Sequence, residues 1–266
     1  MNTDSTLNTI TTGDGVRLAY RVDGEANAPP LLFVNSLGTD LRMWEPQAVC
    51  LSRRFRVIRY DTRGHGRSDA PPGPYTIERL GGDILALLDS LSVERAHVCG
   101  LSLGGLTALW LAAHHPGRLR SAILANTAAR IGTVEGWSAR IEAVRAGGMP
   151  AVRETVLERF FSAAFRRAHP EVVDAIGDTL VATDPLGYIA ACSALRDTDL
   201  RAEVSAVRVP SLVVAGALDE STPPSQAEEL HTAIPGSKLV VLPEAAHLSN
   251  LEQPEAFNQA IFDWLI

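Results

Sequence analysis

Short apolar runs of valine, isoleucine and leucine recur along the chain, and most of them are separated by stretches long enough to form a helix. The runs lie at residues 16–22, 31–34, 55–60, 96–100, 121–124, 212–215 and 239–242, and each ends within two residues of Gly, Asn, Asp or Pro. Strands that are buried on both faces of a sheet and joined by helical crossovers have this pattern. The sequence therefore predicts an α/β fold with a mostly parallel sheet.

The stretches between the runs differ in their patterns. No helical pattern separates the first two runs, so we expect residues 16–22 and 31–34 to form an antiparallel edge of the sheet. Apolar residues at helical spacing predict one helix over residues 76–91. A second helix is predicted over residues 103–115, because Pro-Gly follows at its end.

The alternation stops between about residues 128 and 208, where the pattern is helical throughout. Pro150, Pro170 and Pro185 stand where they can open helices, since the first helical position needs no backbone N–H. We predict three or four short helices, inserted between two strands of a single domain. The predicted division is a core of residues 1–127 and 209–266 with a helical cap insertion of residues 128–208.

Charge and hydropathy exclude several classes of protein. The formal net charge of the 266-residue chain is -7, whereas nucleic-acid binding requires a clustered basic face. No apolar stretch reaches the roughly 18 residues that a membrane-spanning helix needs. The first ten residues contain neither a basic nor an apolar signal region. We expect a cytoplasmic protein that binds neither nucleic acid nor membrane.

Three cysteines, Cys50, Cys99 and Cys192, are spread along the chain. They are odd in number, far apart and not at the spacing of metal ligands. We expect all three to be buried thiols, with no disulfide and no metal site.

Ser102 lies in the sequence VCGLSLGG, residues 98–105, between a predicted strand and a predicted helix. A serine that attacks a carbonyl must stand above the sheet, which a sharp strand-to-helix turn achieves by straining the backbone. Such a turn leaves no room for side chains two residues away, and Gly100 and Gly104 meet this requirement. Ser102 is therefore a candidate nucleophile. The alternative, a serine that only marks the turn, stays open until a base and an acid are found.

His247 and Asp219 are the candidates for the base and the acid. His247 lies in the loop LPEAAHLSN, residues 242–250, after the last predicted strand, so it reaches the same carboxyl edge of the sheet as Ser102. Asp219 follows the strand at residues 211–215 and would hold the imidazole in one tautomer. Asp219 has an alternative role as a helix cap, in which case Glu220 is the candidate acid.

Acyl transfer also requires donors for the developing oxyanion. The backbone N–H of Leu103, at the start of the helix after Ser102, is one candidate. The backbone N–H of Leu37, in the loop after the strand at residues 31–34, is the other.

These features together resemble the α/β-hydrolase superfamily over essentially the whole chain. The resemblance rests on the order Ser102, Asp219, His247, on the turn around the serine, and on YDTRGHGRS at residues 60–68. It implies an α/β-hydrolase fold with a mostly parallel eight-stranded sheet, flanking helices and a helical cap. It also implies a structural role for residues 61–68.

More narrowly, the sequence resembles the 3-oxoadipate enol-lactonases of aromatic catabolism. The segments concerned are VNSLGTDLRMWEPQ at residues 34–47, GLSLGG at 100–105 and NTAARIGTVEGWSARI at 126–141. The resemblance implies hydrolysis of a small anionic lactone through an acyl-enzyme, with no metal or organic cofactor. A carboxylesterase or a cofactor-free perhydrolase would use the same residues, and a ligand-binding receptor that keeps the fold is a third possibility.

The carboxylate of such a lactone needs a positive partner, because an unpaired buried charge is costly. Arg130, just past a strand end, is the candidate, and a surface salt bridge is its alternative role. Trp137 is the candidate wall of the substrate pocket, and a core position in the insertion is its alternative.

Overall fold

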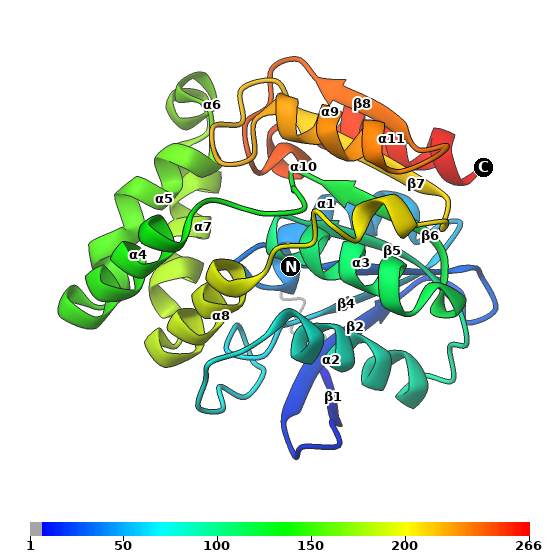
Figure 1. Ribbon diagram of the computed structural model, residues 1–266, viewed down its shortest axis with the longest axis horizontal. Coiled ribbons are helices and arrows are strands. Elements are labelled where there is room, and N and C mark those ends of the chain that lie inside the picture. The colour runs from blue at the N-terminus through cyan, green and yellow to red at the C-terminus, as the bar shows by residue number, and fades with distance from the viewer. Residues whose placement is uncertain (1–6) are drawn as a thin grey trace.

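An eight-stranded sheet runs through the centre of the computed structural model, which describes residues 7–266 (Figure 1). In chain order the strands are β1 (Asn8–Thr11), β2 (Arg17–Asp23), β3 (Pro30–Val34), β4 (Arg56–Tyr60), β5 (Ala96–Leu101), β6 (Leu119–Ala125), β7 (Ser211–Gly216) and β8 (Lys238–Leu242). Their order across the sheet is β1-β2-β4-β3-β5-β6-β7-β8. The pairs β1–β2 and β2–β4 are antiparallel, and all other neighbours are parallel. The mostly parallel sheet predicted from the sequence is confirmed.

One strand prediction is wrong. Residues 31–34 do not form an antiparallel edge with β2, because β3 lies inside the sheet between β4 and β5 and is parallel to both. Its residues Leu31 to Val34 are all buried, as the continuous apolar run of an interior parallel strand requires. The prediction assumed that strands adjacent in sequence also pair in space. The true edge strand β1 was not predicted, since Ile10 is its only buried residue.

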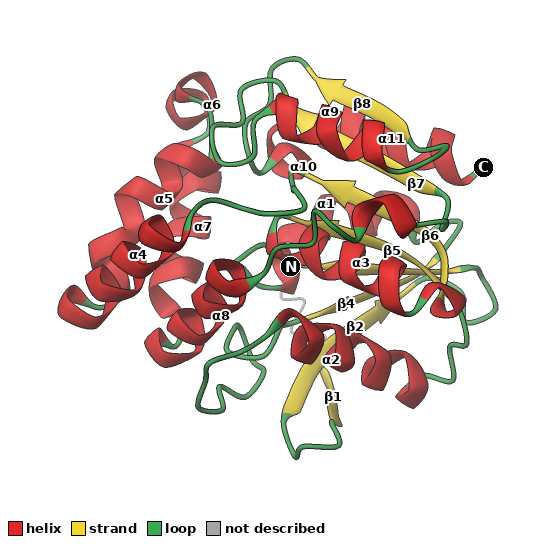
Figure 2. Ribbon diagram, viewed as in Figure 1, coloured by secondary structure: helices red, strands yellow, loops and turns green. Residues whose placement is uncertain are grey.

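Helices flank the sheet (Figure 2). Those of the core are α1 (Glu45–Leu51), α2 (Ile77–Ser90), α3 (Leu103–His114), α9 (Pro224–Ala233), α10 (Ser249–Glu252) and α11 (Pro254–Leu265), with the 3-10 turns η1 (Leu41–Trp44) and η2 (Pro116–Arg118). Helices α2 and α3 pack against each other, as do α1 and α11. The predictions of helices over residues 76–91 and 103–115 are confirmed.

A separate group of helices lies at one side of the sheet, between β6 and β7 in the chain (Figure 1). It consists of α4 (Val134–Gly147), η3 (Met149–Val152), α5 (Arg153–Phe160), α6 (Ala163–Ala168), α7 (Pro170–Ala182) and α8 (Pro185–Asp197). The 3-10 turn η4 (Val204–Ala206) follows in the chain and packs against α3 and α9 of the core. The five α-helices exceed the three or four that were predicted. The break between α5 and α6 has no proline to mark it and is made by Ser162, whose side chain caps α6.

Two of the three prolines singled out in this region open helices as predicted. Pro170 begins α7 and Pro185 begins α8, whereas Pro150 lies in η3. We retain residues 128–208 as the proposed insertion and call them the cap. Residues 1–6, which begin the proposed 1–127 segment, lie outside the described residues. The prediction that the first ten residues contain no signal region falls partly on them.

Two further sequence predictions concern membranes and cysteines. Among residues 7–266, no helix combines the length and apolar character needed to cross a membrane. Cys99 and Cys192 are buried free thiols, but Cys50 is exposed, which corrects the prediction for that residue. Cys50 and its neighbour Val49 lie on the outer side of α1, whereas Ala48 and Leu51 of the same helix face the core.

Candidate active site

Ser102 occupies a sharp turn between β5 and α3. Its backbone angles are φ 58° and ψ −115°, a region that costs a non-glycine residue about 1–3 kcal/mol. A Cβ on Gly100 would lie 2.0 Å from the Gly104 carbonyl oxygen, and a Cβ on Gly104 would lie 2.2 Å from the Val34 carbonyl oxygen. The two glycines therefore permit a turn that holds the serine above the end of β5, where it lines a cavity.

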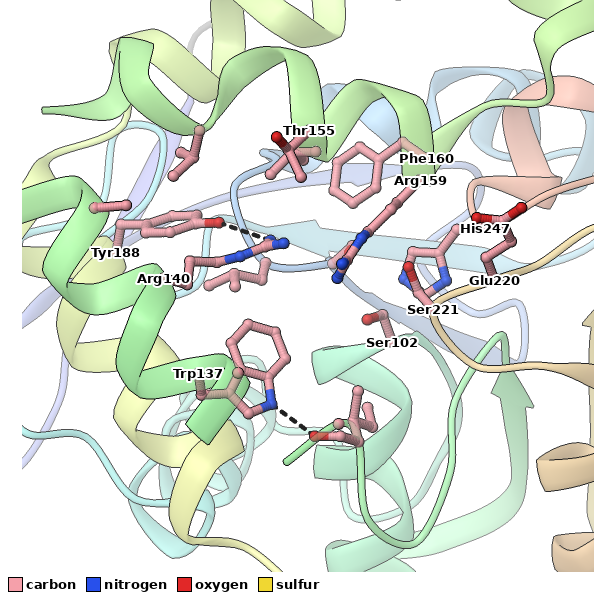
Figure 3. Close-up of a pocket in the computed structure, with 18 of the residues that line it drawn as sticks. Ser102, Trp137, Arg140, Thr155, Arg159, Phe160, Tyr188, Glu220, Ser221 and His247 are labelled. Carbon is pink, nitrogen blue, oxygen red and sulfur yellow. Dashed lines mark hydrogen bonds between the residues drawn. The ribbon is translucent and has the colours of Figure 1, made fainter. Parts of the chain in front are cut away.

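His247 and Asp219 form a buried hydrogen-bonded pair. The Nδ1 atom of His247 lies 2.8 Å from the Oδ2 atom of Asp219, and the two side chains are 3% and 0% exposed. With Nδ1–H donating to the carboxylate, Nε2 is left to face the cavity. Figure 3 shows Ser102 and His247 next to each other in that cavity, and no hydrogen bond between them is recorded among residues 7–266.

Four further hydrogen bonds fix the Asp219 carboxylate. Oδ2 accepts from the Asn126 amide at 2.9 Å and the Thr222 hydroxyl at 2.7 Å, and Oδ1 accepts from the backbone N–H groups of Ser221 and Thr222. Burial alone would raise the pKa of Asp219, but the neighbouring His247 and these hydrogen bonds lower it to about 2. Asp219 thus fixes the turn at Ser221 and Thr222 and binds His247 at the same time. It does not cap the helix that follows, because the N-cap of α9 is Pro223 and no side chain caps it.

Asn126, at the end of β6, was passed over in the sequence because it carries no carboxylate. Its backbone has φ 44°, a conformation that asparagine tolerates better than most residues. Besides Asp219, its amide nitrogen reaches the carbonyl of Ala246 at 3.1 Å, and its oxygen accepts from the Ser249 hydroxyl at 2.5 Å. Asn126 therefore links the acid to the loop that carries His247. A polar residue at the carboxyl end of an interior strand was the available signal.

The two predicted oxyanion donors are the backbone N–H groups of Leu37, in the loop after β3, and Leu103, directly after Ser102. Leu103 is the first residue of α3, where an N–H group has no acceptor within the helix, and Leu37 lines the same cavity as Ser102. Neither N–H has a hydrogen-bond acceptor among residues 7–266. Neither donor is therefore used within the described fold, and their assignment as the oxyanion donors stays a prediction.

His65 shapes the loop that contains Leu37. Its Nε2 atom accepts from the Gly38 N–H at 2.9 Å, while Nδ1 lies 3.2 Å from the Arg63 carbonyl oxygen, to which it donates. Burial lowers the pKa of His65 to about 4, so the ring is neutral near pH 7 and can accept this bond. The structural role that the sequence resemblance implied for residues 61–68 corresponds to this contact.

The cavity has a volume of about 490 Å³ and is roofed by the cap. Arg140 of α4 and Arg159 of α5 point into it and toward each other (Figure 3). Arg140 lies 3.5 Å from the Tyr188 hydroxyl and stacks over the Trp137 ring at 5.4 Å. Neither arginine has an acidic partner within 4.0 Å in the described part of the chain. The cavity therefore contains two arginines that form no ion pair within the described chain, and one carboxylate, that of Glu220.

Arg130, the predicted partner of the substrate carboxylate, is not among the residues that line the cavity. Its guanidinium lies 3.4 Å from Asp199, with both side chains more than a third exposed, which is the surface ion pair that had been kept open as its alternative. Trp137 does line the cavity, where its Nε1 donates to the Ile131 carbonyl at 2.6 Å. Helical spacing was the missed signal, since Arg140 is three residues beyond Trp137 on the same face of α4.

The strained serine turn, the buried Asp219–His247 pair and the mostly parallel sheet together define an α/β hydrolase. Residues 29–254 match the family described as alpha/beta hydrolase fold, and the chain belongs to this family.

Comparison with known proteins shows which hydrolases the chain is similar to. The chain is 44% identical to 3-oxoadipate enol-lactonase 2 of Acinetobacter baylyi over 250 aligned residues. The alignment covers 94% of this chain and 93% of that protein. The crystal structure of the enol-lactonase from Burkholderia xenovorans LB400 superposes with a TM-score of 0.95 at 47% identity, over 97% of this chain and 99% of that one. A putative carbamate hydrolase RutD of Pseudomonas syringae pv. syringae is 32% identical, over 89% of this chain and 93% of that protein.

Proposed function

We propose that this protein hydrolyses 3-oxoadipate enol-lactone to 3-oxoadipate through a triad of Ser102, His247 and Asp219. The observation that carries the proposal is the pair Arg140 and Arg159, two cations without acidic partners in the cavity that also contains Ser102. Similarity to enol-lactonases from two bacteria supports the same substrate.

The two arginines suit the charge of this substrate. The lactone is a five-membered enol ester that bears an acetate arm, so its carboxylate must find a partner when it leaves water. A guanidinium binds a carboxylate through charge-assisted, often bidentate hydrogen bonds. We assign this role to Arg140 and Arg159 in place of Arg130, with Trp137 as a wall beside the ring.

The reaction begins with His247. Its Nε2 atom removes the Ser102 proton as Oγ attacks the lactone carbonyl, and Asp219 stabilises the imidazolium that forms. The N–H groups of Leu37 and Leu103 bind the oxyanion. When the tetrahedral intermediate collapses, the ring C–O bond breaks and the enolate leaves. It takes the proton from the His247 imidazolium and becomes the ketone, so that Nε2 is free to act as a base again.

Water completes the cycle. His247 again acts as base, a water molecule attacks the acyl-enzyme, and Ser102 Oγ leaves with the proton. The product is the open-chain dicarboxylate 3-oxoadipate. Acyl transfer of this kind needs neither a metal nor an organic cofactor. We assign the protein to bacterial aromatic catabolism in the cytoplasm, acting on a small anionic molecule.

The experiment that tests this proposal compares three substrates on the wild-type protein. We expect kcat/KM for the enol-lactone to exceed that for a neutral ester of similar size and for a saturated lactone with the same acetate arm. A preference for the neutral ester would instead indicate a general carboxylesterase. Absence of turnover with all three would favour a binding protein that has kept the fold.

A further inference from the structure

A short segment of the cap, Phe160 to Ser162, contacts the loop that carries His247 and runs from the last residue of α5 to the N-cap of α6. The Leu248 N–H donates to the Phe160 carbonyl at 2.9 Å. Two residues further along, the Ser162 N–H donates to the Glu252 carboxylate at 2.7 Å. Both contacts join residues that are far apart in the chain. They hold the segment against Leu248, in the loop after β8, and against Glu252, the last residue of α10.

The ring of Phe160 lies against the imidazole itself. The two ring centroids are 5.7 Å apart and the planes differ by 22°, a stacked arrangement. Phe160 is 6% exposed and forms part of the cavity wall beside His247 (Figure 3). One face of the imidazole is therefore covered by the cap and not by the core.

This contact bears on how the imidazole is oriented. The hydrogen bond to Asp219 anchors His247 at Nδ1, and a ring held at one atom can still rock about that anchor. An aromatic face stacked on the imidazole restricts that motion and keeps water from one side. An aromatic ring also attracts a cation, so it stabilises the imidazolium more than the neutral imidazole.

We propose that Phe160 is a positioning residue for His247, and that Glu252 holds Phe160 in place through the Ser162 N–H. The cap then does more than enclose the substrate, because it completes the surroundings of the base. The inference rests on the proposed function to the extent that His247 acts as that base.

The test uses p-nitrophenyl acetate, whose acetyl group is small and uncharged, so that the reaction depends on the triad and not on the two arginines. Phe160→Leu removes the aromatic face but keeps an apolar side chain, and Phe160→Tyr restores the ring. The loss of a cation–aromatic contact predicts a roughly 2- to 30-fold lower acylation rate for Phe160→Leu. KM should change little, and Phe160→Tyr should retain most of the rate.

The matched control is Phe165→Leu, the same substitution in the same part of the cap. Phe165 packs against Phe161 and His169 and is not among the residues that line the cavity. The acylation rate of Phe165→Leu should therefore stay at the wild-type value. A second readout is the low-field proton resonance of the Nδ1–H between His247 and Asp219. This resonance should broaden in Phe160→Leu and stay sharp in Phe165→Leu.

Glu252 supplies an independent comparison. Glu252→Gln keeps an oxygen that accepts from the Ser162 N–H, whereas Glu252→Ala removes it. We expect Glu252→Ala to lower the acylation rate in the same direction as Phe160→Leu, and the double variant to be little worse than either single variant. Glu252→Gln should resemble the wild type.

Two results would overturn the inference. One is an unchanged acylation rate and an unchanged Nδ1–H resonance in Phe160→Leu with a raised KM, which would make Phe160 only a wall of the pocket. The other is an equal loss in Phe160→Leu and Phe165→Leu, which would indicate general damage to the cap. Either result leaves the triad intact, whereas full activity of His247→Ala would refute the proposed function itself.

Discussion

The Nδ1 atom of His247 lies 2.8 Å from the Oδ2 atom of Asp219, although 27 residues separate the two in the chain and each follows a different strand of the sheet. Parallel strands β7 and β8 are neighbours, so the loops after them meet at one edge. The pair is buried beneath the cap, where water does not compete for the hydrogen bond.

The first prediction concerns this pair. Asp219→Asn should lower kcat on the order of 10³–10⁴-fold, because an amide favours the wrong imidazole tautomer. Steady-state kinetics on the enol-lactone measures the loss. Glu220→Gln is the matched control, since Glu220 lines the cavity but makes no hydrogen bond with His247 in the described chain, and it should keep its activity. If Asp219→Asn loses only a few-fold, Asp219 is a turn cap and Glu220 becomes the candidate acid.

The second prediction concerns Asn126. Asn126→Gly keeps a backbone that is free to adopt positive φ but removes the amide from Asp219 and Ala246. Loss of these bonds to buried groups should lower the free energy of unfolding by about 1–3 kcal/mol and reduce kcat. Asn126→Ala adds backbone strain and should unfold at lower denaturant concentration still. Wild-type kcat in Asn126→Gly would show that the amide does not help to hold the acid.

The third prediction concerns the substrate carboxylate. Arg140→Met and Arg159→Met should each lower kcat/KM for the enol-lactone about 10- to 150-fold, the value of a charge-assisted hydrogen bond of roughly 1.5–3 kcal/mol. A neutral ester of similar size should be affected far less. Arg130→Met provides the control, because Arg130 lies outside the cavity and pairs with Asp199. Equal losses on charged and neutral substrates would remove the two arginines from anion binding.

The fourth prediction concerns pH and stability. The folded-state pKa of His65 is about 4 and its ordinary value is 6.5, so between these values the unfolded chain binds a proton that the folded chain does not. Stability from this group is complete above pH 6.5 and is lost as pH falls toward 4. The loss amounts to about 2 kcal/mol at pH 5.

His65→Gln tests this linkage by denaturant unfolding at pH 7 and pH 5. The variant should lack the part of the pH dependence that comes from His65, while keeping an oxygen that can accept from the Gly38 N–H. Asp61, whose pKa burial raises to about 6, contributes the opposite slope, and His97 contributes the same slope as His65. Asp61 and His97 are present in both the wild type and His65→Gln, so their contributions cancel when the two pH dependences are subtracted. Identical pH dependence in parent and variant would contradict the buried neutral state of His65.

The sequence was most informative where one local pattern decides the structure. The glycines around Ser102 and the apolar runs of the parallel strands are of this kind, because steric fit and burial act over a few neighbouring residues. It was least informative where distant segments meet. The interior place of β3, the surface pairing of Arg130 and the contact of Phe160 with His247 all depend on how the sheet is ordered and how the cap folds over it.

Arg140 illustrates the boundary between these cases. Helical spacing from Trp137 puts it on the cavity face of α4, so a sequence argument that had followed that face would have found it. No spacing in the sequence places Arg159 at the cavity in the same way. It comes from α5, and only the packing of α5 beside the serine brings it near Arg140.

The most direct test of the central claim is the rate of enol-lactone hydrolysis by the wild-type protein and by Ser102→Ala. The substitution removes one oxygen from a position that the fold exposes, so circular dichroism should show an unchanged fold. We predict rapid turnover by the wild type and a loss on the order of 10⁶-fold in the variant, with His247→Ala and the double variant little different from it. Turnover by Ser102→Ala at the wild-type rate would contradict the account.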